Sequence, residues 1–358
     1  MTPRFTRIAF RLPAIVILAA ALAAIAIGGF SYFESASEVR RQATDKLVSL
    51  RESRHAALAQ YFRSIEEDLE LYSASAHVAA ALEAFTAAFA GIGPETRDRE
   101  ERALRSVYSP EHRTGNADQL TSAGTPLTAQ YFQLHNRFHT WFQFTHEVRG
   151  YYDLFLVSPS GDVVYTAFKE ADFASNLVRG KWSGSGLAKA FASALDGGQA
   201  FADFEPYAPS DSAPAAFIAR KIVRDGRTLG VLALQMPIDR INEVMQVTAG
   251  MGETGETYIV GPDYLMRSDS RFSETSTILK TSVATGTAKR AFAGESGIDV
   301  VDDYRGVPVL SAFQPFVFSG TTWAVMAEID VAEVDTPIDT MRNFYDKDGT
   351  LASKFAIE

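Results

Sequence analysis

The sequence predicts an α+β protein with an N-terminal transmembrane helix, a long amphipathic helix after it, and then two tandem modules with antiparallel sheets. Three observations predict this order. An uncharged apolar run lies near the N-terminus, a helical period follows it, and two similar series of short strands occupy much of the rest of the 358-residue chain. This length is more than one typical domain needs.

The composition is that of an ordinary globular protein, with 46% hydrophobic and 22% charged residues. A formal net charge of -10 argues against a nucleic-acid partner, because nucleic-acid-binding surfaces are basic. The chain has no cysteine, which excludes disulfides, thiolate metal sites and a cysteine nucleophile. No nucleophile elbow, P-loop, kinase motif or H-E-x-x-H occurs, so we expect neither an enzyme nor a cofactor or metal.

An apolar run over residues 12–33 predicts a transmembrane anchor, since about 20 apolar residues span a bilayer core. Three arginines precede the run: Arg4, Arg7 and Arg11. Residues 1–11 are therefore expected to stay cytoplasmic and the rest of the chain to be exported. A cleaved signal peptide is the alternative, although residues 35–37 form a poor cleavage site and the run is long for one.

Residues 34–149 have a predominantly helical pattern. Between 38 and 72, apolar side chains recur every three or four residues and the positions between them are mostly polar. This apolar stripe needs a partner, either in the same chain or in a second subunit of a homodimer. A glycine–proline breaker at 91–94 and loop composition over 109–126 separate further helices, the last over 127–148.

The two predicted modules, 150–248 and 249–335, show the same order of elements. In the first, a hairpin over 153–166 precedes a short helix over 186–195 and two strands over 216–223 and 228–235. In the second, strand, turn and strand over 257–267 are followed by a similar helix near 291 and a strand over 324–330. We interpret this as an internal duplication of an α/β unit. Residues 336–358 are expected to form a helix stub and a polar tail.

The segments Gly150–Val157, Val164–Phe173 and Gly252–Gly261, with Arg267–Arg271 and Trp323–Asp330, resemble the double Cache (PDC-type, PAS-like) sensor modules of bacterial chemotaxis receptors, histidine kinases and cyclases. The resemblance covers roughly residues 34–335. It implies a bacterial receptor that senses small molecules in the periplasm. From the one apolar run and the helix stripe we expect a single-pass protein of the inner membrane and a homodimer. The second membrane helix and output domain usual in that family are not expected in this sequence, which is consistent with a truncated gene, a fragment or a one-pass protein.

An asymmetry between the repeats favours a ligand pocket in the membrane-distal module, 150–248. This first copy carries a long insert over 169–186 after its hairpin. Pockets of this kind are apolar with a few convergent polar groups. Six residues are expected to line it: Tyr165, Lys169, Trp182, Asp203, Tyr207 and Arg220. The expected ligand is an amino acid, an organic acid or an amine.

Four of these residues have expected roles. Asp203 would pair with an amine, Arg220 or Lys169 with a carboxylate, and Trp182 would close over the ligand. The alternative is that Asp203 and Arg220 form a structural pair or face solvent. The matching segment of the second module, Arg267–Arg271, is expected to be an exposed loop, and that module is expected to relay packing changes toward the membrane.

Three other patterns have simpler explanations than a site. Gly250–Gly255 matches G-x-G-x-x-G, but a strand and not a helix follows it, so it is expected to be a loop. Two histidines four residues apart, His135 and His139, share a helix face near His146; we favour packing histidines over metal ligands. The acidic run over residues 66–70 is expected to be a solvated helix face.

A second function remains open at this point. The chain could be a one-pass structural or partner-binding membrane protein that acts through dimerisation of its long helix, with a vestigial pocket. A thermal-shift screen with amino acids, organic acids and amines would distinguish it from a ligand-binding sensor.

Overall fold

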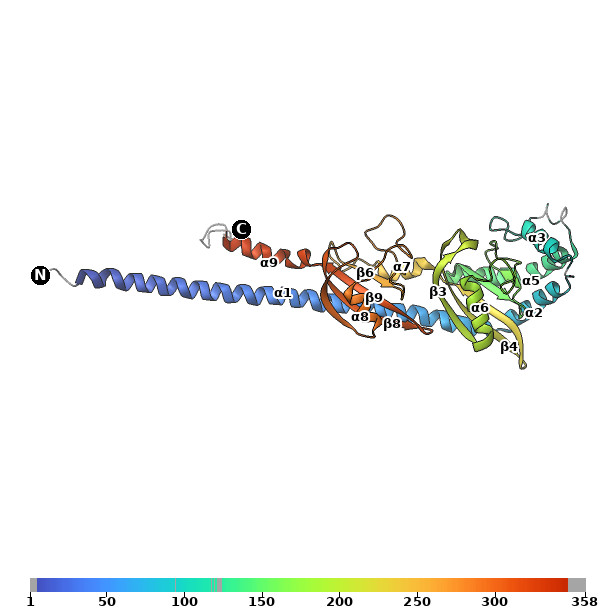
Figure 1. Cartoon of the computed structure of the whole chain (residues 1–358), viewed down its shortest axis with the longest axis horizontal. Helices are drawn as coiled ribbons and strands as arrows, with labels where there is room; N and C mark the ends of the chain where they lie inside the picture. The colour runs from blue at the N-terminus through green and yellow to red at the C-terminus, as the bar shows by residue number, and fades with distance from the viewer. Residues whose placement is uncertain (1–4, 94, 117, 119, 121–123, 347–358) are drawn as a thin grey trace.

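The protein is elongated, and one long helix, α1 (Phe5–Ser73), runs along most of its length (Figure 1). The computed structural model describes residues 5–93, 95–116, 118, 120 and 124–346, so residues 1–4 and 347–358 of the expected ends lie outside it. Within the described residues, α1 is the one helix that is long and apolar enough to cross a membrane. A signal sequence passes the same test. Its most apolar window has a mean hydropathy of 2.4 and is not buried. The predicted anchor and amphipathic helix are thus one continuous helix.

The first module lies at the end of α1 farthest from the N-terminus (Figure 1). Its sheet has the strand order β2-β1-β5-β4-β3 and is antiparallel throughout. The strands are β1 (Asp153–Val157), β2 (Val163–Thr166), β3 (Gln199–Tyr207), β4 (Ala213–Arg224) and β5 (Arg227–Gln235). The helices are α2 (Ala76–Ala90), α3 (Arg97–Val107), α5 (Pro126–Arg149) and α6 (Gly186–Gly197), with the short 3-10 helix η1 (Ala208–Ser210) after β3. Helix α6 covers one face, while α1, α2 and α5 cover the other.

The second module lies midway along α1 and has the sheet order β6-β9-β8-β7 (Figure 1). Its elements are α7 (Ile238–Met245), β6 (Glu256–Val260), α8 (Gly286–Phe292), β7 (Gly297–Asp302), β8 (Pro308–Phe318), β9 (Thr321–Asp330) and α9 (Val331–Asp346). Single bridges such as Val260 to Met266 replace the second strand that was expected up to residue 267. That part of the expectation was wrong. The α+β fold with two antiparallel sheets is confirmed.

The apolar stripe of α1 packs against its own chain. Leu58, Ile65 and Leu69 are at most 1% exposed. Phe62 contacts the rings of the second module, with centroids 4.5 Å from Phe318 and 5.3 Å from Trp323. The stripe therefore has a partner within the chain.

The acidic run of α1 is a solvated face only in part. Glu67 and Glu70 are exposed, as expected. Asp68 is buried, accepts a 2.8 Å hydrogen bond from the Tyr151 hydroxyl and pairs with Arg149, which corrects the expectation for this residue. Glu66 accepts a hydrogen bond from Gln199 of β3. Asp68 and Glu66 therefore fasten α1 to the first module.

An ion pair and aromatic rings join the two modules. Asp203 of β3 accepts hydrogen bonds from the Arg267 guanidinium, the shortest 2.9 Å, and from the Trp323 indole N–H at 3.1 Å. The rings of Phe201 and Phe204 contact Trp323 beside it. Arg267 is 2% exposed, so the expectation of an exposed loop was wrong for this residue. Its charge can be buried because Asp203 and Asp263 both pair with it.

Candidate ligand-binding site

Two aligned residues, Asp153 and Gln235, begin a buried acidic centre in the first module. They lie directly opposite each other where β1 pairs with β5. Strand alternation places both on the face covered by α6, with Phe155 as their neighbour on β1. One carboxylate oxygen of Asp153 accepts backbone N–H groups at 2.7–2.9 Å from Leu154 and the 167–168 turn. Its other oxygen, Oδ2, is buried without a partner.

A second carboxylate, Asp172, reaches the centre from the loop after β2. Its Oδ2 accepts a 2.5 Å hydrogen bond from the Tyr207 hydroxyl at the end of β3. The Tyr207 ring is 4.8 Å from that of Phe217, which pairs with Gln235 across β4 and β5. Asp172 Oδ1 and Gln235 Oε1 are buried without partners, like Asp153 Oδ2. The centre therefore holds three acceptor atoms that no described residue satisfies.

Burial sets the protonation of these groups. It raises the pKa of Asp153, with repulsion from Asp172 as the next cause, because an ionised carboxylate is costly away from water. Burial likewise raises the pKa of Asp172 to about 7, although the Tyr207 hydrogen bond opposes it. A cation placed between the two carboxylates would stabilise their ionised forms and provide the missing donors.

A surface groove of about 380 Å³ lies next to the acidic centre. Gln235 lines this groove and also belongs to the centre, so it connects the two. Tyr152 and Ser210 both line the groove and donate hydrogen bonds to Glu170 of the loop after β2. That contact fixes the loop after β2 beside the groove.

The structure distributes the six predicted residues over several places. Tyr207 belongs to the acidic centre. Tyr165 and Lys169 are buried together, with the Lys169 ammonium 3.8 Å above the Tyr165 ring. Tyr165 lies on the α2 and α5 face, where its ring contacts Phe85 and Phe142.

The other three lie outside the acidic centre. Trp182 donates its indole N–H to the Ala171 carbonyl and lines a separate polar groove of about 510 Å³. Asp203 joins the modules, where its partner is Arg267. Arg220 donates to Gln199 and lies 3.7 Å from Glu70 of α1. Asp203 and Arg220 therefore have partners within the chain, but not each other.

Sequence reasoning missed Asp153, Asp172 and Gln235. A signal for Asp153 and Gln235 was present, because each is the one polar residue in the buried part of an otherwise apolar strand. Asp172 lies within the insert over 169–186 that was identified, but nothing in the sequence distinguished it from other acidic residues. Burial without partners singles these residues out.

The second module has carboxylates at the matching positions. Glu256 and Glu328 pair across β6 and β9, as Asp153 and Gln235 pair across β1 and β5. Atoms of both glutamates and Asp303 lie within 4.8 Å of one another. Here the chain supplies the donors: Tyr258 and Ser311 to Glu328, and Ser270 and Tyr304 to Glu256. The second centre is thus satisfied internally, unlike the first.

Burial of Glu328 predicts a pH-dependent stability. It raises the pKa from 4.5 to about 7, so the folded chain binds this proton more tightly than the unfolded chain does. The resulting stability is present below pH 4.5 and is lost as the pH rises through 7. One pKa unit corresponds to about 1.4 kcal/mol. We therefore expect the free energy of unfolding to fall by about 3 kcal/mol as the pH rises through this range.

Chemical unfolding of wild type and Glu328→Gln at pH 5 and pH 8 measures this change. The difference between the two proteins should shift in favour of Glu328→Gln at the higher pH. Glu274→Gln, at an exposed position, is the matched control and should show no such shift. A wild-type profile that Glu328→Gln follows in parallel would contradict the assignment.

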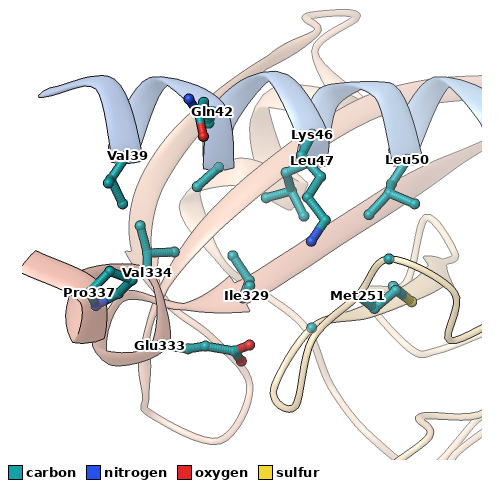
Figure 2. Close-up of a pocket in the computed structure, with 13 residues that line it drawn as sticks. Val39, Gln42, Lys46, Leu47, Leu50, Met251, Ile329, Glu333, Val334 and Pro337 are labelled. Atoms are coloured by element: carbon teal, nitrogen blue, oxygen red, sulfur yellow. The ribbon is translucent and has the colours of Figure 1, made fainter. Parts of the chain in front are cut away.

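Another groove, of about 240 Å³, lies between α1 and α9 near the predicted membrane (Figure 2). Leu47 and Leu50 of α1 and Ile329 of β9 form much of its apolar wall. Its acidic residue, Glu333, is already engaged, since it accepts hydrogen bonds from the backbone N–H groups of Glu253 and Thr254. This groove is a junction that holds α9 in place. Among the described residues that line it, no buried side-chain nitrogen or oxygen lacks a hydrogen-bond partner.

Apart from β2, the two sheets have corresponding strand orders, and both lie on the same N-terminal helix. One of them has a buried centre with unpartnered groups. This arrangement is that of a tandem PAS-like sensor domain. The chain belongs to the Cache domain family, whose model matches residues 35–338. No curated protein matches the sequence at a significant level.

Several solved sensor domains are similar to this chain. The periplasmic sensory domain of the Campylobacter jejuni chemoreceptor Tlp1 has 12% identity and a TM-score of 0.48, covering 84% of this chain and 99% of that one. The ligand-binding domain of the Pseudomonas aeruginosa PAO1 amino acid chemoreceptor PctB with L-Arg has 13% identity and a TM-score of 0.39, covering 76% and 97%. The sensor domain of the Vibrio cholerae histidine kinase DctB has 14% identity and a TM-score of 0.39, covering 69% and 94%.

Proposed function

We propose that this chain is the ligand-sensing part of a membrane-anchored bacterial receptor and that it is not an enzyme. Residues 12–33 would anchor it in the inner membrane and the bulk of the chain would be periplasmic. Membership of the Cache domain family and the apolar segment of α1 support this. The ligand would be a small organic molecule that carries an ammonium group, such as an amine or an amino acid.

The observation that carries the ligand class is the set of three unpartnered acceptors: Asp153 Oδ2, Asp172 Oδ1 and Gln235 Oε1. Buried acceptors without donors are costly, and an ammonium group has three N–H donors and a positive charge. The groove beside Gln235 would be the way in.

Ligand binding would reach the second module through β3. This strand carries Tyr207 of the acidic centre at one end and Asp203, the partner of Arg267, nearer its middle. From there β9 leads directly into α9. A homodimer remains a prediction, but the α1 stripe that motivated it is buried within the chain. The structural alternative, which needed that stripe to be free, is therefore less favoured.

Gln235→Met tests the site, because it removes one unpartnered acceptor while keeping the side-chain volume. We expect the substitution to weaken binding of an ammonium ligand about tenfold or more and to leave the ligand-free chain equally or more stable, since it deletes a buried unsatisfied group. Thermal shift of the full chain in nanodiscs, with a panel of amines, amino acids and dicarboxylates, measures both. A residue with only a structural role would instead lower the melting temperature.

Gln130→Met, at an exposed position on α5, is the matched control and should bind as wild type does. Asp172→Asn should weaken binding as well, because it removes a charge from the centre. Stabilisation by dicarboxylates alone, or full affinity in both Gln235→Met and Asp172→Asn, would place the ligand elsewhere.

A further inference from the structure

The opposite face of the first module's sheet holds a buried lysine, Lys169. Burial lowers its pKa to about 7, and the negative charge of Asp153 opposes this shift. Lys169 is 1% exposed, and its Nζ donates to the Thr166 carbonyl. The rings of Tyr165 and Phe173 flank it, at 3.8 and 4.9 Å from Nζ. Within the described residues, no carboxylate oxygen lies within the 4.0 Å of an ion pair. A buried charge left in this state is costly.

Four buried polar atoms next to this ammonium have no partner: Tyr108 Oη, Tyr131 Oη, His135 Nε2 and His139 Nε2. Their rings form one cluster, with centroids 4.0 Å apart for His135 and His139 and 4.7 Å for Tyr108 and His135. The Tyr131 ring is 5.2 Å from that of Tyr108. The lysine adjoins this cluster, because the Tyr131 and Tyr108 rings both contact Phe173. These residues, with Lys169, are named the donor cage.

The hydrogen bond between Tyr165 and His139 holds the imidazole in place, with the Tyr165 hydroxyl 2.7 Å from His139 Nδ1. Burial, and then the charge of Lys169, lower the pKa of His139 to about 3 and that of His135 further, so both rings are neutral. The cage therefore presents two tyrosine O–H donors and the lysine, beside neutral imidazoles that donate or accept according to their tautomer.

We propose that the donor cage is a second binding site, for a small monoanion such as chloride, formate or acetate. An anion would pair with protonated Lys169 and accept hydrogen bonds from the unpartnered hydroxyls of Tyr108 and Tyr131. A metal ion is disfavoured there, because the ammonium would repel it. The cage lies on the α5 side and the acidic centre on the α6 side, so the two sites take ligands of opposite charge.

Thermal unfolding of the full chain in nanodiscs, in a chloride-free buffer with added sodium chloride, formate or acetate, tests the cage. At about 100 times the dissociation constant, we expect one of these anions to raise the melting temperature by on the order of 5 °C. Lys169→Met should abolish that rise. Lys280→Met, at an exposed lysine of the second module, should keep it and so controls for general salt effects.

Tyr131→Phe keeps the test decisive should Lys169→Met not fold. It deletes one unpartnered hydroxyl, so the ligand-free melting temperature should hold while anion affinity falls about tenfold. Gln235→Met should leave the anion response intact, which separates this site from the ammonium site. An equal response to all anions in every variant, or none in wild type, would overturn the proposal; the four atoms would then be hydrated by internal water.

Discussion

Replacing Leu58 with aspartate should destabilise the protein more than any other single change considered for it. Leu58 is fully buried on the stripe of α1, within the largest apolar cluster of the chain. Truncating a buried leucine costs about 2–5 kcal/mol, and an unpaired buried carboxylate adds to that cost. We therefore expect a loss of about 5 kcal/mol or more in the free energy of unfolding, seen as a melting temperature lower by on the order of 10 °C.

Leu71→Asp is the matched control, since Leu71 lies on the same helix and is 64% exposed. It should change stability by less than about 0.5 kcal/mol. Molecular mass should be measured alongside stability. Because the stripe packs within the chain, Leu58→Asp should destabilise each chain whether or not it is paired with another. If Leu58→Asp melts like wild type but changes the oligomeric state, the stripe serves a dimer and the packing described for α1 is wrong.

Removing Asp203 should loosen the contact between the two modules. Arg267 is buried and keeps only Asp263 as an acidic partner once Asp203 is gone. Breaking a buried ion pair on one side typically costs about 3–5 kcal/mol, mostly because the remaining charge is uncompensated. Chemical unfolding of Asp203→Ala should show a loss of this size. Limited proteolysis should find the connection around α7 more open.

The double variant Asp203→Ala, Arg267→Met gives the sharper result. With neither charge present, we expect it to be more stable than Asp203→Ala alone, since an apolar pair can replace a buried ion pair at little cost. Glu83→Ala, which removes the partner of exposed Arg227, is the control and should cost under about 1 kcal/mol. If Asp203→Ala also costs under 1 kcal/mol, the ion pair does not hold the modules together.

Local patterns were enough to predict much of the fold. The apolar run over 12–33, the helical period after it and the short strands of both modules are each set by residues close together in the sequence. Periodicity reports which side of an element is apolar, and the buried Leu58 and Leu69 agree with it. Periodicity does not show which surface covers that apolar side. The sequence therefore allowed packing within the chain or against a second subunit. The contacts of α1 with β8 and β9 show that it packs within the chain.

The candidate site was less predictable. Tyr165, Lys169 and Tyr207 were selected as polar and aromatic residues near a sheet, and all three are buried around the centres described in the first module. Asp203 and Arg220 looked equally suitable, because ligand-binding and structural charges have the same residue types. What separates them is whether a partner is in reach, and Arg267 lies in the other module, far along the sequence from Asp203.

The sequence alone predicted the apolar N-terminal helix, its long continuation, the two modules and the likeness to Cache sensors. Only the tertiary structure showed which module keeps buried groups without partners. Asp153 with Gln235, and Glu256 with Glu328, hold matching places in the two repeats. Tyr258, Ser311 and Ser270 satisfy the second pair, while the first keeps unpartnered oxygens. Strand pairing and loop packing decide whether hydrogen-bond donors lie close to these carboxylates. Neither the pairing nor the packing can be read from the sequence pattern of a single segment.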